Sequence, residues 1–297
     1  MAGICYQSGG YLGRFPHSRS HSGQFGRRCG TEGHLRIESG SLHPYTVNKL
    51  ALLTFLLLFS AACRPADDSW ERVQAAGVLK VGLDPTYPPF EVADAAGVSG
   101  LDVDLARALT ADLGVEAEFV YFGFDGLYDA LATEQVDVLL SALVIAPERG
   151  KDFAFSEPYF NAGQVLIVPA NDEEITEMAD LNGRTLAVEL GALGHVEATT
   201  WAKRIPDLTV RSYTTGDEAL TAVLTGEADA ALIDAIGGRL FLKEQPQLKI
   251  AQEVTVEPFA LVVRIEDEQL LTRLNTSLED LCQSGELDDI IGKWLGD

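Results

Sequence analysis

Short strand-like and helix-like patterns alternate along the chain from residue 78 onward. Val78–Leu83 is an apolar run typical of a buried strand, and the three prolines within residues 85–89 exclude a helix directly after it. Residues 101–113 place apolar side chains on one helical face and acidic side chains on the other. The alternation continues as strand, helix and strand at 119–121, 124–132 and 136–140. This alternation predicts α/β layers with a largely parallel sheet.

A second set of the same elements follows the apolar strand pattern at residues 165–168. Its elements alternate as strand, helix, strand, helix and strand over residues 184–188, 194–201, 208–213, 216–225 and 230–233. Residues 131–140 also align without gaps on 223–232, and each segment holds a helix end, a polar turn with an aspartate and a buried strand. The pattern indicates two successive α/β lobes, in which Asp137 and Asp229 are expected to be turn residues.

The N-terminal region has the pattern of an export signal. Leu50–Ala62 is an apolar run of thirteen residues, too short to span a bilayer comfortably, and Lys49 precedes it. With small residues before Cys63, the segment resembles a bacterial lipoprotein signal, in which the cysteine is acylated and becomes the first mature residue. Ser60 departs from that resemblance, so ordinary secretion after cleavage nearby stays an alternative.

Residues 1–46 have no hydrophobic period and are rich in Ser, Gly, Arg and His. We expect them to be a non-native or disordered leader, with translation starting at Val47. Residues 47–62 are then the signal peptide, and residues 63–76 a tether. Peptides from residues 1–46 in a mass spectrum of the protein would refute the internal start.

The charge balance excludes several classes of partner. Without residues 1–62, the chain keeps 16 Lys or Arg against 43 Asp or Glu, a formal net charge of −27 on 235 residues. Such a surface repels nucleic acid and anionic lipid headgroups, so we expect neither as a partner. The one histidine in this part is His195, which argues against a multi-histidine metal site. We expect no metal, no cofactor and no catalytic residue.

Several short motifs stand in a specific order. They are Tyr87-Pro88-Pro89-Phe90-Glu91, Gly100-Leu101-Asp102-Val103-Asp104-Leu105-Ala106, Phe124-Asp125-Gly126-Leu127, Pro147-Glu148-Arg149, Phe155-Ser156-Glu157-Pro158-Tyr159, Gly285-Glu286-Leu287 and Lys293-Trp294-Leu295-Gly296. In this order and spacing, they make residues 78–296 similar to the bacterial extracellular solute-binding proteins of family 3, the amino-acid receptors of ATP-driven importers.

This resemblance implies the type II periplasmic-binding-protein fold, with two α/β lobes that each hold a mixed sheet flanked by helices. The two lobes are joined by two crossing segments, expected near 160–166 and 253–259, and the ligand lies between them. Residues 77–164 and 256–297 would form lobe 1, and residues 165–255 would form lobe 2.

The resemblance also implies roles for individual residues. Arg149 matches the arginine that binds the ligand α-carboxylate, and a guanidinium fork suits that group. Asp234, at a strand end, is expected to bind the ligand ammonium, or else to cap the next helix. Asp84 either accepts from an ammonium or braces the proline-rich loop. Tyr87 and Phe124 resemble the aromatic pair that encloses the ligand side chain.

Backbone groups complete the expected site. Ser141, Ala142 and Val144 follow a strand near the arginine. Gly191, Ala192 and Leu193 lie between a strand and a helix, where free N–H groups can receive a carboxylate oxygen, or where the chain forms a plain tight turn. Val144, Ala146 and Ala192 stand where the family commonly has Ser or Thr. Each lost neutral hydrogen bond is worth roughly 0.5–1.5 kcal/mol, so these departures affect ligand affinity or class.

The sequence thus predicts an extracytoplasmic, membrane-anchored lipoprotein, a monomer that captures an amino acid or related small carboxylate and presents it to the permease of an ABC importer. The protein contacts the membrane through its lipid anchor alone. Two alternatives remain: a periplasmic dehydratase of the cyclohexadienyl type on the same fold, and a sensory ligand-binding protein. For the dehydratase, Glu189 is the one spare acid expected near the cleft.

Overall fold

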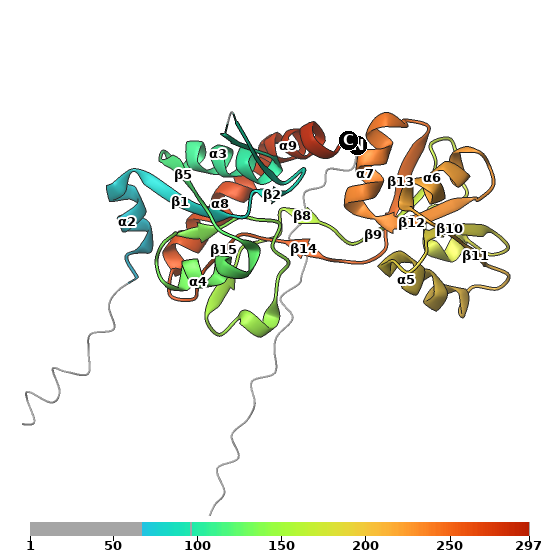
Figure 1. Cartoon of the computed structure of the whole chain (residues 1–297), viewed down its shortest axis with the longest axis horizontal. Coiled ribbons are helices and arrows are strands. Elements are labelled where there is room, and N and C mark those ends of the chain that lie inside the picture. Colours follow the sequence, from blue (N-terminus) through green and yellow to red (C-terminus); the bar gives the residue numbers. More distant parts are fainter. Residues whose placement is uncertain (1–66, 96, 297) are drawn as a thin grey trace, which may run out of the picture. The chain divides into compact units, whose positions relative to one another are not determined.

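The computed structural model describes residues 67–95 and 97–296 (Figure 1). The leader, the signal peptide and Cys63 lie outside these residues. Two five-stranded sheets form the framework. Within the described residues, no helix combines the length and apolar character needed to cross a membrane.

The first sheet contains β1, whose bounds Val78–Leu83 equal those predicted. Its strand order is β5 (Glu116–Tyr121), β1, β6 (Val138–Leu139), β15 (Val262–Arg264) and β7 (Phe153–Phe155). β1 pairs in parallel with β5 and β6, whereas β15 runs antiparallel to β6 and β7. The sheet is therefore mixed rather than largely parallel, because the chain returns to it from the second lobe through β15.

The second sheet repeats this arrangement. Its strand order is β11 (Thr209–Tyr213), β10 (Thr185–Glu189), β12 (Ala230–Asp234), β9 (Gln164–Pro169) and β13 (Leu248–Glu253). β10 is parallel to β11 and β12, and β9 is antiparallel to β12 and β13. Two lobes, each with one mixed sheet and its helices, confirm the predicted fold class.

Helices pack on both sheets. The first lobe carries α2 (Ser69–Ala76), α3 (Leu101–Leu113), α4 (Leu127–Ala132), α8 (Glu268–Ser284) and α9 (Glu286–Leu295). The second lobe carries α5 (Leu193–Ala202), α6 (Gly216–Leu224) and α7 (Ala235–Glu244). Short 3-10 helices occur at Phe124–Gly126, Pro147–Arg149 and Met178–Asp180. A small sheet of β2 (Thr86–Tyr87), β3 (Glu91–Asp94) and β4 (Gly97–Ser99) follows β1.

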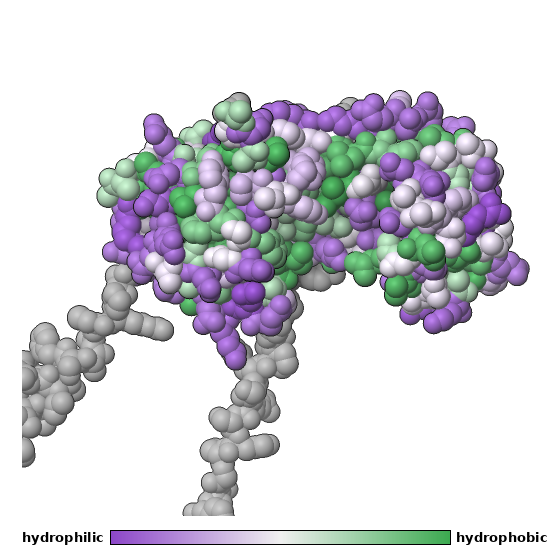
Figure 2. Space-filling view, in the orientation of Figure 1, coloured by the Kyte–Doolittle hydropathy of each residue, from purple (hydrophilic) through white to green (hydrophobic). Residues whose placement is uncertain are grey.

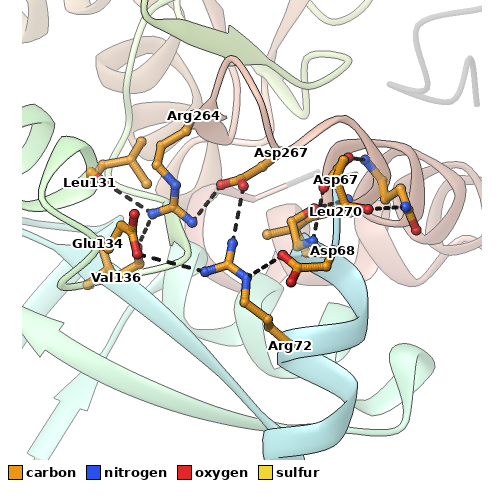
Figure 3. Close-up of polar contacts among 11 residues, drawn as sticks. Asp67, Asp68, Arg72, Leu131, Glu134, Val136, Arg264, Asp267 and Leu270 are labelled. Carbon is orange, nitrogen blue, oxygen red and sulfur yellow. Dashed lines mark hydrogen bonds and ion pairs between the residues drawn. The ribbon is translucent and has the colours of Figure 1, made fainter. Parts of the chain in front are cut away.

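The predicted tether is shorter than expected, because residues 69–76 form α2. Trp70 and Val73 of this helix are buried in the main core, which fixes it to the first lobe. Figure 3 shows the polar contacts that reinforce this attachment. Arg72 lies 3.4 Å from Asp267, and Asp267 lies 2.6 Å from Arg264, whose side chain also donates to two backbone carbonyls.

The aligned segments 131–140 and 223–232 have the same structural role in both lobes. Asp137 accepts a hydrogen bond from the N–H of Lys80 at 2.9 Å, and Asp229 accepts one from the N–H of Thr185 at 2.7 Å. Each aspartate therefore ties its turn to the first parallel strand of its sheet, as the turn interpretation predicted.

Two crossing segments connect the lobes, and they pair as β8 (Phe160–Asn161) and β14 (Pro258–Phe259). Gly163 is required where they meet, because a Cβ atom there would lie 2.1 Å from the carbonyl oxygen of Thr255. The proposed lobe boundaries at 164/165 and 255/256 stay a prediction. Figure 2 shows hydrophilic residues over much of the visible surface, with hydrophobic residues interspersed on both lobes.

Candidate functional site

A cavity of about 580 Å³ is lined by residues of both lobes and of both crossing segments. Its size is typical of sites for small molecules. The lining consists of Asp84, Thr86, Tyr87, Phe124, Ser141, Ala142, Val144, Ala162, Gln164, Leu193, Asp234, Ile236, Glu257 and Phe259. The structure thus brings eight of the eleven predicted ligand-binding residues together, namely Asp84, Tyr87, Phe124, Ser141, Ala142, Val144, Leu193 and Asp234.

Arg149 is not among the lining residues. It ends the 3-10 helix Pro147–Arg149, is exposed, and holds its guanidinium carbon 3.9 Å from the ring centre of Tyr128. This stacking orients a side chain that carries a positive charge at any relevant pH. Its predicted role with the ligand carboxylate stays a proposal.

Gly191 and Ala192 also lie outside the lining. The N–H of Gly191 donates to Nδ1 of His195 at 3.2 Å, and the N–H of Ala192 donates to the carbonyl of Glu189 at 3.3 Å. Of the two interpretations of this segment, the structure has the tight turn, and the turn before α5 uses both N–H groups internally. Leu193 reaches the cavity through an exposed side chain.

Asp84 braces the lobe-1 side of the cavity. Oδ1 accepts from the hydroxyl of Thr86 at 2.8 Å, and Oδ2 accepts from the N–H of Phe124 at 2.9 Å. One carboxylate therefore holds both the proline-rich loop and the backbone that carries the Phe124 ring. The bracing interpretation is confirmed, while its contact with a ligand ammonium stays open.

Asp234 caps a helix and also lines the cavity. It is the last residue of β12 and the N-cap of α7, where Oδ1 accepts from the N–H of Gly237 at 2.8 Å. Its side chain is also exposed and lines the cavity. The capping interaction fixes the carboxylate without neutralising its charge.

Aromatic rings form one part of the lining. Tyr87 stacks on Phe90 with ring centres 5.7 Å apart, and Phe90 meets the ring of Phe259 edge-on at 5.4 Å. Tyr87 and Phe124 remain 47% and 59% exposed, so both rings have free surface for a ligand. Burial raises the pKa of the Tyr87 hydroxyl, and the charges of Asp234, Glu91 and Glu257 raise it further.

A pair of buried acids, Glu91 and Asp102, lies behind this lining, and both are fully buried. Asp102 Oδ2 accepts from the N–H of Ala142 at 2.7 Å and thereby holds that residue at a φ of 47°, in the left-handed region. Burial and the charge of Asp102 raise the pKa of Glu91 to about 9, and burial raises the pKa of Asp102 to about 7. The pair therefore retains a proton at neutral pH.

Two acids at or behind the cavity had no role predicted from the sequence. Glu91 stood in a family motif without a role, and Glu257 was not singled out at all, although it falls within the second predicted crossing segment. Glu257 lines the cavity from just before β14. Among the residues that the structure describes, no group of three or more His, Cys, Asp or Glu side chains is placed to hold a metal ion.

Three comparisons agree with this geometry. The family model for bacterial extracellular solute-binding proteins, family 3, matches residues 79–297. The chain is 31% identical over 232 residues to the ABC transporter arginine-binding protein 1 of Escherichia coli, covering 74% of this chain and 92% of that protein.

Two solved structures have the same fold. The L-cystine solute receptor of Neisseria gonorrhoeae, in its unliganded open conformation, matches 76% of this chain and 96% of its own length, with 27% identity and a TM-score of 0.67. An ancestral cyclohexadienyl dehydratase matches 76% and 95%, with 26% identity and a TM-score of 0.67. With the matching family model and the two-lobed site, the chain belongs to the bacterial extracellular solute-binding proteins of family 3.

Proposed function

We propose that this protein is the extracytoplasmic receptor of an ABC importer and captures a free amino acid between its two lobes. The observation that carries the proposal is the cavity itself, because residues from both lobes and both crossing segments line it. A ligand that contacts both sides favours closure of the lobes about the crossing segments. The closed form would then be recognised by a membrane permease.

Each charged end of an amino acid has a proposed partner. Asp234 binds the ammonium, since its carboxylate is exposed to the cavity and held in place by the N–H of Gly237. Arg149 binds the α-carboxylate, since it lies five residues beyond the cavity-lining Val144 and is held on the ring of Tyr128. Tyr87 and Phe124 enclose the side chain of the ligand.

The attachment to the membrane is part of the same proposal. Acylation of Cys63 would place the receptor on the outer side of the cytoplasmic membrane, as a monomer that contacts the bilayer through its lipid alone. Cleavage at Cys63 with incorporation of a labelled fatty acid would support this assignment, and a mature protein that begins elsewhere would exclude it.

The main test is isothermal titration calorimetry of the purified protein with a panel of amino acids. We expect at least one to bind, and we expect Arg149→Met to weaken that binding by at least about 100-fold, because a bidentate charged contact is lost. Arg204→Met is the matched control, since Arg204 is also exposed and stacks on an aromatic ring, that of Trp201, away from the cavity. Binding that survives Arg149→Met unchanged would contradict the role of Arg149.

An enzymatic alternative has one observation in its favour, the similarity to the ancestral cyclohexadienyl dehydratase. Such a reaction needs a general acid near the leaving hydroxyl. Glu189, the acid considered for that role, is not among the residues that line the cavity. Incubation with prephenate decides the question, because product formation would establish the enzyme and ligand-induced stabilisation without product would support the receptor.

A further inference from the structure

The charged residues that line the cavity are all acidic. They are Asp84, Asp234 and Glu257, and the lining contains no Lys, Arg or His. An amino acid brings one ammonium, which one carboxylate suffices to bind. The cavity therefore holds more negative charge than the backbone of a zwitterion requires, and like charges in one cavity are costly unless a cation accompanies them.

The three carboxylates differ in how far the protein already uses them. Asp84 accepts hydrogen bonds from Thr86 and Phe124, and Asp234 accepts one from Gly237. The Glu257 carboxylate makes no hydrogen bond and no ion pair with any residue in the described ranges 67–95 and 97–296. Among the three lining acids, it alone has a carboxylate with no partner in the described residues, so both of its oxygens are free to bind a distal group of the ligand.

The backbone of Glu257 is fixed even though its carboxylate is unpartnered. Its N–H donates to Oδ1 of Asn161 at 2.8 Å, and its carbonyl accepts from the N–H of Ala162 at 2.9 Å. Both partners belong to the other crossing segment. These two bonds hold Glu257 at the cavity wall, where a functional side chain is more precise than on a free loop.

The surroundings of Glu257 suit a cation. Its charge and that of Asp234 both act on the Tyr87 hydroxyl, so the two carboxylates lie near the same aromatic ring. The exposed faces of Tyr87 and Phe124 can attract a cation through their π systems. An apolar or acidic ligand side chain would leave Glu257 uncompensated once water is excluded.

We propose that Glu257 is a specificity residue that selects amino acids with a positively charged side chain, a guanidinium or an ammonium. This inference rests on the proposed function and names its ligand class. The carboxylate binds the distal cation, while Asp234 and Arg149 bind the two charges of the ligand backbone.

The test compares L-arginine with L-citrulline, its uncharged analogue of nearly the same shape, by calorimetry on the purified protein. We expect arginine to bind at least about tenfold more tightly than citrulline, as the loss of one charge-assisted hydrogen bond predicts. In Glu257→Gln this preference should fall to less than about threefold, with the affinity for citrulline little changed. L-lysine reports whether an ammonium is accepted as well.

Two further variants make the result specific. Glu244→Gln removes the same charge at an exposed position on α7 outside the cavity, and it should keep the full preference. Glu257→Asp retains the charge on a shorter side chain and should keep part of it. If Glu257→Gln fails to fold, as seen by a lost thermal transition, the comparison of arginine with citrulline on the unaltered protein and on Glu257→Asp decides.

The outcomes separate the two proposals. Binding of neutral or acidic amino acids in preference to arginine and lysine would overturn the role of Glu257 and leave the receptor function standing. A preference for arginine that persists in Glu257→Gln would likewise overturn it. If no amino acid binds, the proposed function falls together with this inference.

Discussion

In the cluster of Figure 3, the buried carboxylate of Asp267 lies 2.6 Å from Arg264 and 3.4 Å from Arg72, whereas the carboxylates of the cavity have no cation beside them among the described residues. Both regions bring acids together. In the first, the side chains of Arg264 and Asp267 are only 5% and 3% exposed, so an unpaired charge would be severely destabilising. In the cavity, Asp234 is exposed, and water can solvate its charge until a ligand replaces it.

The difference separates carboxylates that stabilise the fold from those available for binding. In the folded protein, Asp267, the acid that fixes α2 to the first lobe, has two arginine partners. The acids of the cavity accept hydrogen bonds only from N–H and hydroxyl groups, or from no group among the described residues. Substitutions in the two regions are therefore expected to change different quantities, stability in one and affinity in the other.

The largest expected effect is on stability. Arg264→Met leaves Asp267 buried beside the more exposed Arg72 and removes two hydrogen bonds to backbone carbonyls. We expect urea denaturation to show a loss of about 3–5 kcal/mol in the free energy of unfolding. Arg107→Met, which removes an exposed arginine at 3.5 Å from Asp104, should cost less than about 1 kcal/mol. Equal losses in the two variants would show that the buried ion pair of Asp267 stabilises the fold no more than an exposed ion pair does.

A smaller effect, on affinity alone, is expected for Asp234→Asn. Asparagine caps a helix about as well as aspartate, so the melting temperature should stay nearly unchanged. The affinity for an amino acid should fall about tenfold, because a charged hydrogen bond worth roughly 1.5–3 kcal/mol becomes a neutral one worth roughly 0.5–1.5 kcal/mol. Calorimetry and thermal denaturation on the same samples measure both quantities. Asp217→Asn, at an exposed position on α6, should change neither.

A third effect, on the pH dependence of stability, concerns the buried pair Glu91 and Asp102. Folding raises the pKa of Glu91 from 4.5 to about 9, so the folded protein holds a proton that the unfolded chain releases between these values. Stability contributed by this proton is present below about pH 4.5 and is lost as the pH rises toward 9. Glu91→Gln removes this titration, and its free energy of unfolding should fall less steeply between pH 5 and 8 than that of the unaltered protein.

The difference in slope between the two proteins can reach about 1.4 kcal/mol per pH unit for one whole proton. Asp112→Asn, which changes an exposed acid of α3, should reproduce the unaltered slope. Parallel pH profiles for Glu91→Gln and the unaltered protein would show that the pair does not hold its proton across this range.

The sequence predicted the periodic elements best. The bounds of β1 and α3 agree with the patterns at 78–83 and 101–113, because local alternation and one apolar face define them. The strand pattern at 136–140 gave the shorter β6 (Val138–Leu139), since strand length depends on the partner strands. The mixed sheets followed from the family resemblance, whereas periodicity alone suggested parallel ones.

The candidate site was predicted mainly through motifs, and the misses have physical reasons. Glu257 is one of 45 acidic residues, and what distinguishes it is the absence of a partner in space, which no local pattern encodes. The raised pKa of Glu91 depends on its burial and on the charge of Asp102, a neighbour in space that no local pattern reveals. The N–H groups of Gly191 and Ala192 are occupied because the turn before α5 brings His195 and the carbonyl of Glu189 within hydrogen-bond distance of them.

The packing of α2 has a mechanical consequence. Because Trp70 and Val73 are embedded in the core and Arg72 contacts Asp267, any force transmitted from residues before 67 enters through the first lobe. The sheet that bears Asp234 is joined to that lobe by the two crossing segments. If the chain is held at its N-terminal end, the lobe that bears Tyr87 would stay in place. The lobe that bears Asp234 would then be the one that moves when the two lobes close.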